Sequence, residues 1–194
     1  FKTEIAPTRK QKGKIICSIG IAIFLYNQYI AYNKKLYKMY QRGLLDSRQK
    51  HFVTAKDFDK YVNHNLKLKL PWIAECGSKA RKKALVNAEN AFKKFFDGLA
   101  GFPRSTKKSN QHVKLYFPKN NKGDWRIWRN KLMIPTLKQV RLKEFGYLPV
   151  GAKVINGTVS CKAGRFYVSV VIDIDEKSKY NKDLEASHHI TTDG

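Results

Sequence analysis

The stretch AENAFKKFFDGLAGFPRSTKK, from Ala88 to Lys108, marks the point at which the pattern of this sequence changes. Its first part has the apolar spacing of an amphipathic helix, with Phe92 and Phe96 on one face. Glycines and Pro103 then end the helical pattern. Before this stretch apolar residues recur at helical spacing, and after it they alternate with polar residues, as in strands. The sequence therefore predicts a helical region that ends here and is followed by a β-region.

Three helices are expected before this boundary. The first covers residues 15–42, where apolar side chains recur at helical spacing. The second begins after Thr54, a candidate N-cap that is followed by an acid at Asp57. The third begins near Ser78, another candidate cap. Its apolar stripe, predicted to pack in the core, comprises Ala84, Leu85, Ala88, Ala91, Phe92, Phe95, Phe96 and Leu99, and its opposite face carries Lys82, Lys83, Asn90, Lys93, Lys94 and Asp97.

Strands are expected on both sides of the helical region. FKTEIAP, residues 1–7, alternates apolar and polar residues and ends at a proline, which predicts one early strand that pairs with a distant one. From about residue 110 onward, short alternating runs are separated by glycine or proline, and the last two flank the hairpin loop Ala163-Gly164-Arg165. This order predicts an α+β fold in which a helical region is inserted into a small antiparallel β-barrel.

The charge of the chain indicates a polyanionic partner. The formal net charge is +24 at pH 7 and the isoelectric point is near 10.0, which favours nucleic acid as the partner. Residues 173–194 differ from the basic body, because they hold six acids against three lysines. We interpret residues 175–194 as an acidic linker.

The sequence offers no convincing catalytic or metal site. Its three cysteines lack the spacing of a zinc site or a disulfide framework, and no nucleophile with a partnering histidine and no phosphate-binding glycine loop is recognisable. Asp173, Asp175 and Glu176 could be imagined as a metal site, but a strand that runs into an acidic linker explains them better. No cofactor is therefore expected for this segment, and no enzyme activity follows from these residues alone.

The most apolar run invites a membrane interpretation. It extends from Ile15 to Tyr32, but Asn27 and Gln28 interrupt it, and the uninterrupted part is shorter than the roughly 20 residues that a span needs. The chain also opens with a charged, strand-like segment instead of a signal peptide. We expect a buried helix and no membrane partner.

Aromatic and basic residues are interleaved in the β-region. This mixture, which allows bases to stack while phosphates are neutralised, involves Tyr116, Phe117, Trp125 and Trp128 together with Lys114, Lys119, Lys122, Arg126 and Arg129. The alternative is that alternate aromatic side chains fill the barrel. Trp125 and Trp128 differ in strand parity, so at most one of them is expected in the core.

Several blocks of the sequence resemble a known family. LYNQYIAYN, LPWIAE, ALVNAENAFKKFFDGLAGFPRSTKK, NKLMIPTLKQVRL and GTVSCKAGRFYVSVVID occur in this order. Together they resemble the N-terminal half of the TnpB (OrfB) family of transposon-encoded RNA-guided nucleases, which are related to miniature type V CRISPR effectors. The resemblance extends over nearly the whole chain.

The resemblance implies a domain organisation. A wedge domain, the β-barrel, would comprise residues 1–7 and 106–174, and a three-helix recognition domain, residues 8–105, would be inserted in it. Residues 175–194 would lead toward a RuvC-type nuclease domain, which in the family uses three carboxylates and Mg²⁺. Asp193 lacks the flanking apolar strand of the family's catalytic motif, so it is not expected to be catalytic.

The resemblance also implies partners and a location. The partners would be a structured guide RNA and a double-stranded target DNA with a short adjacent motif, in the cytoplasm of a prokaryote. Two alternatives remain open: a nuclease-dead relative that represses transcription, and a basic structural RNA-binding protein. The oligomeric state does not follow from the sequence.

Individual contact residues follow from positions in the family pattern and from charge. The motif-reading positions fall at Ser78 and Lys82 and near Lys56, Asp59 and Lys60. The matching positions in the first strands after the helical region lie near Pro118, Lys119 and Asn120. An arginine that is common in the first helix of the family is Ile23 here, so a phosphate contact from that position is in doubt. The predicted nucleic-acid contacts are Lys56, Lys60, Ser78, Lys82, Lys93, Lys107, Lys108, Lys119, Asn120, Trp125, Arg126 and Arg129.

Overall fold

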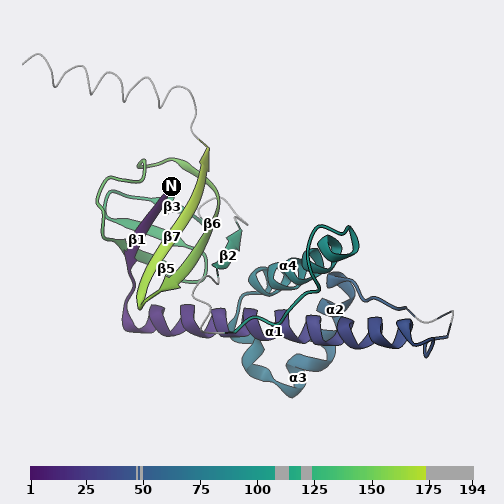
Figure 1. Cartoon of the computed structure of the whole chain (residues 1–194). Coiled ribbons are helices and arrows are strands. Elements are labelled where there is room, and N and C mark those ends of the chain that lie inside the picture. Colours follow the sequence, from purple (N-terminus) through teal and green to yellow (C-terminus); the bar gives the residue numbers. More distant parts are fainter. Residues whose placement is uncertain (47, 49, 108–113, 119–123, 174–194) are drawn as a thin grey trace, which may run out of the picture.

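The computed structural model describes residues 1–46, 48, 50–107, 114–118 and 124–173. Helices and strands follow one another in three groups along the chain, a strand, a helical region and a run of strands (Figure 1). The helical elements are α1 (Arg9–Gln41), α2 (Ala55–Tyr61), the π-helix η1 (Val62–Leu66), α3 (Lys67–Lys69), the 3₁₀ helix η2 (Pro71–Glu75) and α4 (Ser78–Phe96). The strands are β1 (Lys2–Ala6), β2 (Lys114–Pro118), β3 (Arg126–Ile127), β4 (Lys131–Ile134), β5 (Lys138–Leu142), β6 (Lys153–Lys162) and β7 (Arg165–Asp173). The α+β order is therefore confirmed.

The strands form one antiparallel sheet with the order β2-β6-β7-β1-β5-β4-β3. The early strand lies in the middle of this order, because Thr3 pairs with Val168 of β7 and Ile5 with Leu142 of β5. Its predicted pairing with distant strands is thus confirmed. Within the described residues β2 and β3 end the order without pairing to each other, so the sheet is open and the expected closed barrel is not observed.

Helix α1 connects the sheet to the other helices. Figure 1 shows it running beneath the sheet and continuing alongside α2 and α4. It begins at Arg9, six residues before the expected start, because Thr8 and Gln11 form a capping box. By length and apolar content α1 could cross a membrane, but half of its most apolar window is buried inside the protein. It is the core helix that the sequence predicts.

The other two expected helices also form, with one correction. Thr54 caps α2 as predicted, since its side chain accepts a hydrogen bond from the backbone N–H of Asp57 at 3.2 Å. Ser78, in contrast, is not a cap. It already lies inside α4, whose N-cap residue is Gly77, and no side chain caps that end. The residue type alone could not distinguish a cap from the first helical position.

The apolar stripe of α4 is buried over only part of its length. Phe92 is fully buried, and its ring packs against Phe52 and Tyr29, with centroid distances of 5.5 and 6.3 Å. Phe96 is 49% exposed, yet its ring packs against Tyr37 and Phe52 with centroids 5.8 Å away in each case. Leu99, in contrast, is 77% exposed, so the expectation that Leu99 packs in the core is wrong. Leu99 lies beyond Phe96, the last residue of α4, so the apolar stripe continues past the end of the helix.

One of the two tryptophans that flank β3 is buried in the interior of the sheet. Trp125 is 5% exposed and lies against Gly157 of β6, whereas Trp128 is half-buried. The prediction from strand parity is therefore confirmed. The hairpin between β6 and β7 turns at Ala163 and Gly164, both at positive φ, and pairs Lys162 with Arg165.

Candidate nucleic-acid interface

An ion pair joins α2 to α4. Lys82 of α4 lies 3.6 Å (Nζ to Oδ2) from Asp59 of α2, and the side chain of Lys82 is 61% exposed. Lys56 and Lys60 are exposed on α2, and Ser78 is exposed at the first position of α4. Four of the predicted contact residues are therefore exposed on two helices that one ion pair joins. We call these four residues, Lys56, Lys60, Ser78 and Lys82, the α2–α4 face.

A second carboxylate orders the cations of this face. Asp57 lies 3.8 Å from Lys60 and 3.4 Å from Lys50. A hydrogen bond with Thr54, followed by the charges of Lys50 and Lys60, lowers the pKa of Asp57 below its ordinary value. The carboxylate therefore stays ionised at neutral pH and holds lysine side chains near the start of α2. Such exposed pairs add little stability, but they limit where the ammonium groups lie.

A buried arginine supports the same face from within. Arg81 is only 5% exposed and donates hydrogen bonds to the carbonyls of Cys76 at 2.6 Å and Ile73 at 3.3 Å. It thereby fixes η2 to the first turn of α4. Arg81 was not predicted from the sequence, although its position three and four residues before Ala84 and Leu85 places it on the apolar stripe.

The thiol next to this arginine is inert. Cys76 is fully buried, and burial raises the pKa of its thiol to about 11. Cys17, Cys76 and Cys161 are free cysteines. Across the described residues no cluster of three or more histidine, cysteine or acidic side chains could hold a metal ion.

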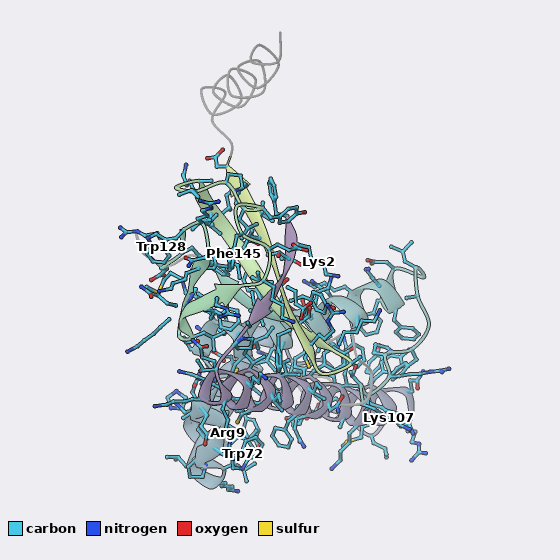
Figure 2. The ribbon with its side chains drawn as sticks, turned by 90° about the vertical axis from the view of Figure 1, so that its left-hand side faces the viewer. Lys2, Arg9, Trp72, Lys107, Trp128 and Phe145 are labelled. Carbon is cyan, nitrogen blue, oxygen red and sulfur yellow. The ribbon has the colours of Figure 1, made fainter. Side chains whose placement is uncertain are left out.

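The segment that leads from α4 back to the sheet crosses α1 at a fixed point. The side chain of Asn27 donates to the carbonyl of Thr106 at 2.9 Å and accepts from its N–H at 2.8 Å. The side-chain amide of Asn27 thus satisfies both the N–H and the carbonyl of Thr106, as the backbone of a neighbouring strand would. Lys107 is exposed directly after this clamp and lies beside α1 in Figure 2. Lys108 lies outside the described residues.

A second asparagine of α1 uses the same geometry. Asn33 is fully buried, accepts from the N–H of Val53 at 2.8 Å and donates to its carbonyl at 3.2 Å. Tyr29 also donates to this carbonyl, at 2.7 Å. The two amides therefore position the chain just before α2 and just after α4. Neither role was predicted, although both residues belong to the LYNQYIAYN block that carries the resemblance.

The predicted contacts on the sheet differ in accessibility. Arg126 and Arg129 are exposed, and the guanidinium carbon of Arg126 lies 5.8 Å from the ring centroid of Trp128. Trp125 is buried in the sheet interior, so its ring has no free face for a base, contrary to the expectation. Lys119 and Asn120 lie outside the described residues.

The remaining predicted contact lies on the lysine face of α4. Lys93 is exposed and lies 3.9 Å from Glu89, one helical turn earlier. Nearby on the same helix, Lys83 lies 5.5 Å from the ring centroid of Tyr116 in β2. This cation–π contact brings α4 against the edge of the sheet. A basic side chain of the helical region therefore lies over an aromatic ring of the sheet at the α4–β2 junction.

Parts of this sequence are similar to known proteins. Residues 1–42 match the family model HTH_OrfB_IS605, which is described as a helix-turn-helix domain. The Escherichia coli (strain K12) protein named "Putative RNA-guided DNA endonuclease InsQ" is 24% identical over 170 residues, which cover 88% of this chain and 39% of InsQ. The resemblance to the TnpB (OrfB) family is confirmed. The chain thus spans about two fifths of the length of this OrfB relative.

The OrfB match and the structure differ in one respect. Residues 1–42 form a strand and a single long helix, β1 and α1, rather than two helices joined by a turn. A groove-reading helix of the helix-turn-helix type is therefore not assigned to this segment. The part of α1 that matches the OrfB model instead forms the core, with Ile15, Leu25 and Tyr29 fully buried.

Proposed function

We propose that this chain is the guide-RNA-binding and target-motif-reading part of a transposon-encoded, RNA-guided DNA endonuclease of the TnpB type. The observation that supports the proposal most directly is the Asp59–Lys82 pair, which joins α2 and α4, the two helices on which the expected motif-reading residues Lys56, Lys60, Ser78 and Lys82 are exposed. The net charge of +24 supports the same conclusion, because so large a charge needs a polyanion to neutralise it.

The helical region and the sheet would bind different nucleic acids. The helical region, residues 8–105, would act as the recognition domain, and its α2–α4 face would read the short motif beside the target in duplex DNA. The sheet would act as the wedge domain and, together with the segment after α4, would hold the scaffold of the guide RNA. Exposed Lys107 and Arg126 would contact phosphates on this path.

The cleavage step would belong to a further domain. The described residues hold no cluster of metal ligands, and InsQ is more than twice as long as the matched region. In the proposed whole protein, a RuvC-type domain with three carboxylates would bind Mg²⁺ and cut the DNA. The residues of this chain would bind and orient the guide and the target. The protein would work in the prokaryotic cytoplasm.

RNA-binding measurements test the proposal. The chain should bind the RNA encoded beside its own gene at least tenfold more tightly than a scrambled RNA of the same length, and the preference should persist as salt is raised. Equal affinity for both RNAs would overturn the proposal in favour of a basic structural RNA-binding protein, whose phosphate-driven binding weakens with salt for any sequence.

A charge reversal localises the contact. Lys107→Glu with Lys108→Glu should weaken RNA binding without changing the melting temperature, because Lys107 is exposed and its backbone is positioned by the neighbouring Asn27 clamp. The neutral pair Lys107→Gln with Lys108→Gln should give a smaller loss. Unchanged affinity in both variants would show that this segment is a solvated connection.

A further inference from the structure

The loop between β5 and β6 exposes large apolar side chains on a fixed backbone. Phe145 is 61% exposed, Tyr147 47% and Val150 63%. Exposed single side chains are common on protein surfaces, but three from one short loop are a local concentration of apolar surface. Two further rings come from neighbouring segments: Phe1, at 42% exposure, contacts Tyr147, and half-buried Trp128 precedes Arg129, whose carbonyl accepts a hydrogen bond from Gly146. We call Phe1, Trp128, Phe145 and Tyr147 the aromatic surface.

Backbone hydrogen bonds hold this loop against the β3–β4 turn. The N–H of Gly146, which lies between the two exposed rings, donates to the carbonyl of Arg129 at 2.9 Å. The N–H of Leu142 donates to Asn130 at 2.9 Å, and that of Gly151 to Ile127 at 3.3 Å. Gly146 and Gly151 have φ of 74° and 75°, which glycine adopts without strain. The loop is therefore positioned along its length.

The stem of the loop is tied to β1. Lys143 donates from its backbone N–H to the carbonyl of Glu4 at 3.0 Å and lies 2.8 Å from the Glu4 carboxylate through its ammonium group. Thr3 donates a hydrogen bond to Glu144 at 2.5 Å. Leu148, in the middle of the loop, is 1% exposed and anchors it in the core. The exposed rings are thus held in place before any partner arrives.

The rings and the neighbouring cations form one surface. Phe1 and Tyr147 make an edge-to-face contact with centroids 5.7 Å apart. Arg129, whose backbone carbonyl accepts the hydrogen bond from Gly146, has an exposed side chain. The guanidinium group of Arg126 lies over the ring of Trp128. Figure 2 shows Trp128 and Phe145 on the same part of the molecule, on the sheet and away from Trp72 and Arg9 near α1. Exposed rings therefore occur together with exposed guanidinium groups.

We propose that the aromatic surface binds unpaired bases of single-stranded nucleic acid by stacking, while Arg126 and Arg129 contact the adjoining phosphates. This combination of ring faces and cations suits single strands, whose bases expose both faces. A duplex does not fit it, because its bases are already stacked on one another. A purely apolar protein partner would leave the two arginines without partners. The inference rests on the proposed function, since it adds a second binding surface for the same RNA.

A fluorescence-anisotropy assay with the chain and an unstructured 15-nucleotide RNA tests this surface. Phe145→Ala with Tyr147→Ala should weaken binding about tenfold or more, since each stacked base depends on a ring. The slope of log affinity against log salt should stay unchanged, because no phosphate contact is removed. Arg129→Ala should instead lower that slope by about one phosphate contact. Native affinity in the double ring variant would overturn the inference.

Matched controls separate base stacking from general apolar contact and from dimerisation. Val150→Ala removes an equally exposed apolar side chain of the same loop, which cannot stack on a base, and should bind RNA as the native chain does. An RNA duplex of the same length should bind native chain and ring variant equally. If the native chain dimerises by light scattering and the ring variant is monomeric with native RNA affinity, the surface joins two copies of the chain and the inference is wrong.

The assay also distinguishes this inference from the proposed function. If the Lys107→Glu and Lys108→Glu variant loses RNA binding while the ring variant does not, only the stacking surface is refuted. If the native chain does not prefer its own RNA over a scrambled one but the ring variant still loses single-strand affinity, the proposed function fails and the surface stands. Absence of any RNA binding by the native chain refutes both.

Discussion

The indole of Trp125 occupies the space that a side chain at Gly157 would need. A Cβ placed on Gly157 would lie 2.7 Å from Cζ2 of Trp125 and closer still to Cη2. Trp125 precedes β3 at one end of the sheet, whereas Gly157 lies in β6, next to the strand at the other end. The two ends of the open sheet therefore approach each other through a side chain, and the contact gives Trp125 a packing role.

Gly157→Ala is expected to destabilise the protein. Because the ring of Trp125 is almost fully buried, it has little room to move away, and overpacking of this kind costs about 1 to 3 kcal/mol. Urea denaturation followed by far-UV circular dichroism measures the loss. Gly13→Ala is the control, since no atom lies within 4 Å of its added Cβ and alanine favours a helix. Equal stability of the two variants would contradict the packing role.

Glu4 is expected to make the stability depend on acid pH. Hydrogen bonds from Arg165 and then Lys143 lower its pKa from 4.5 to about 2. A carboxylate whose pKa is lower in the folded state stabilises the protein fully above pH 4.5 and loses this contribution as the pH falls toward 2. Glu4→Gln should therefore unfold more readily than the native chain at pH 7, and the difference should shrink between pH 4.5 and 2. A difference that stays constant with pH would refute this role of Glu4.

Asn27→Ala is expected to release the segment after α4. The variant loses both hydrogen bonds between the amide and Thr106, and each bond contributes about 1 kcal/mol. The amide proton of Thr106 should then exchange with solvent much faster in NMR hydrogen exchange, whereas that of Val53, held by Asn33, should not change. Equal exchange of Thr106 in native and variant chains would show that other contacts fix this segment.

Lys82→Glu is expected to abolish motif reading by the α2–α4 face. The change places two carboxylates at the position of the Asp59–Lys82 pair and removes an exposed cation. The double variant Lys82→Glu with Asp59→Lys restores opposite charges, so it should recover the native melting temperature but not the preference for the motif. Gel-shift assays with duplex DNA that carries or lacks the motif measure this preference. Its retention in Lys82→Glu would refute the assignment.

Local residue patterns predicted much of the helical region. The capping role of Thr54 followed from its residue type and the acid at Asp57, and the burial of Phe92 followed from helical spacing. The sequence did not predict Arg81, because its buried hydrogen bonds go to carbonyls of η2 that are fixed only in three dimensions. The same holds for the clamps formed by Asn27 and Asn33, whose partners lie 79 and 20 residues away.

The order of helices and strands could be predicted from local patterns, because the periods of 3.6 and 2 residues and the turn residues act locally along the chain. Which aromatic rings are buried depends on packing in three dimensions. Phe92 and Trp125 are in the core, while Phe96 and Phe145 remain exposed, although all four are large and aromatic. The difference arises because burial depends on what packs opposite a side chain, and strands and helices distant in sequence supply that surface.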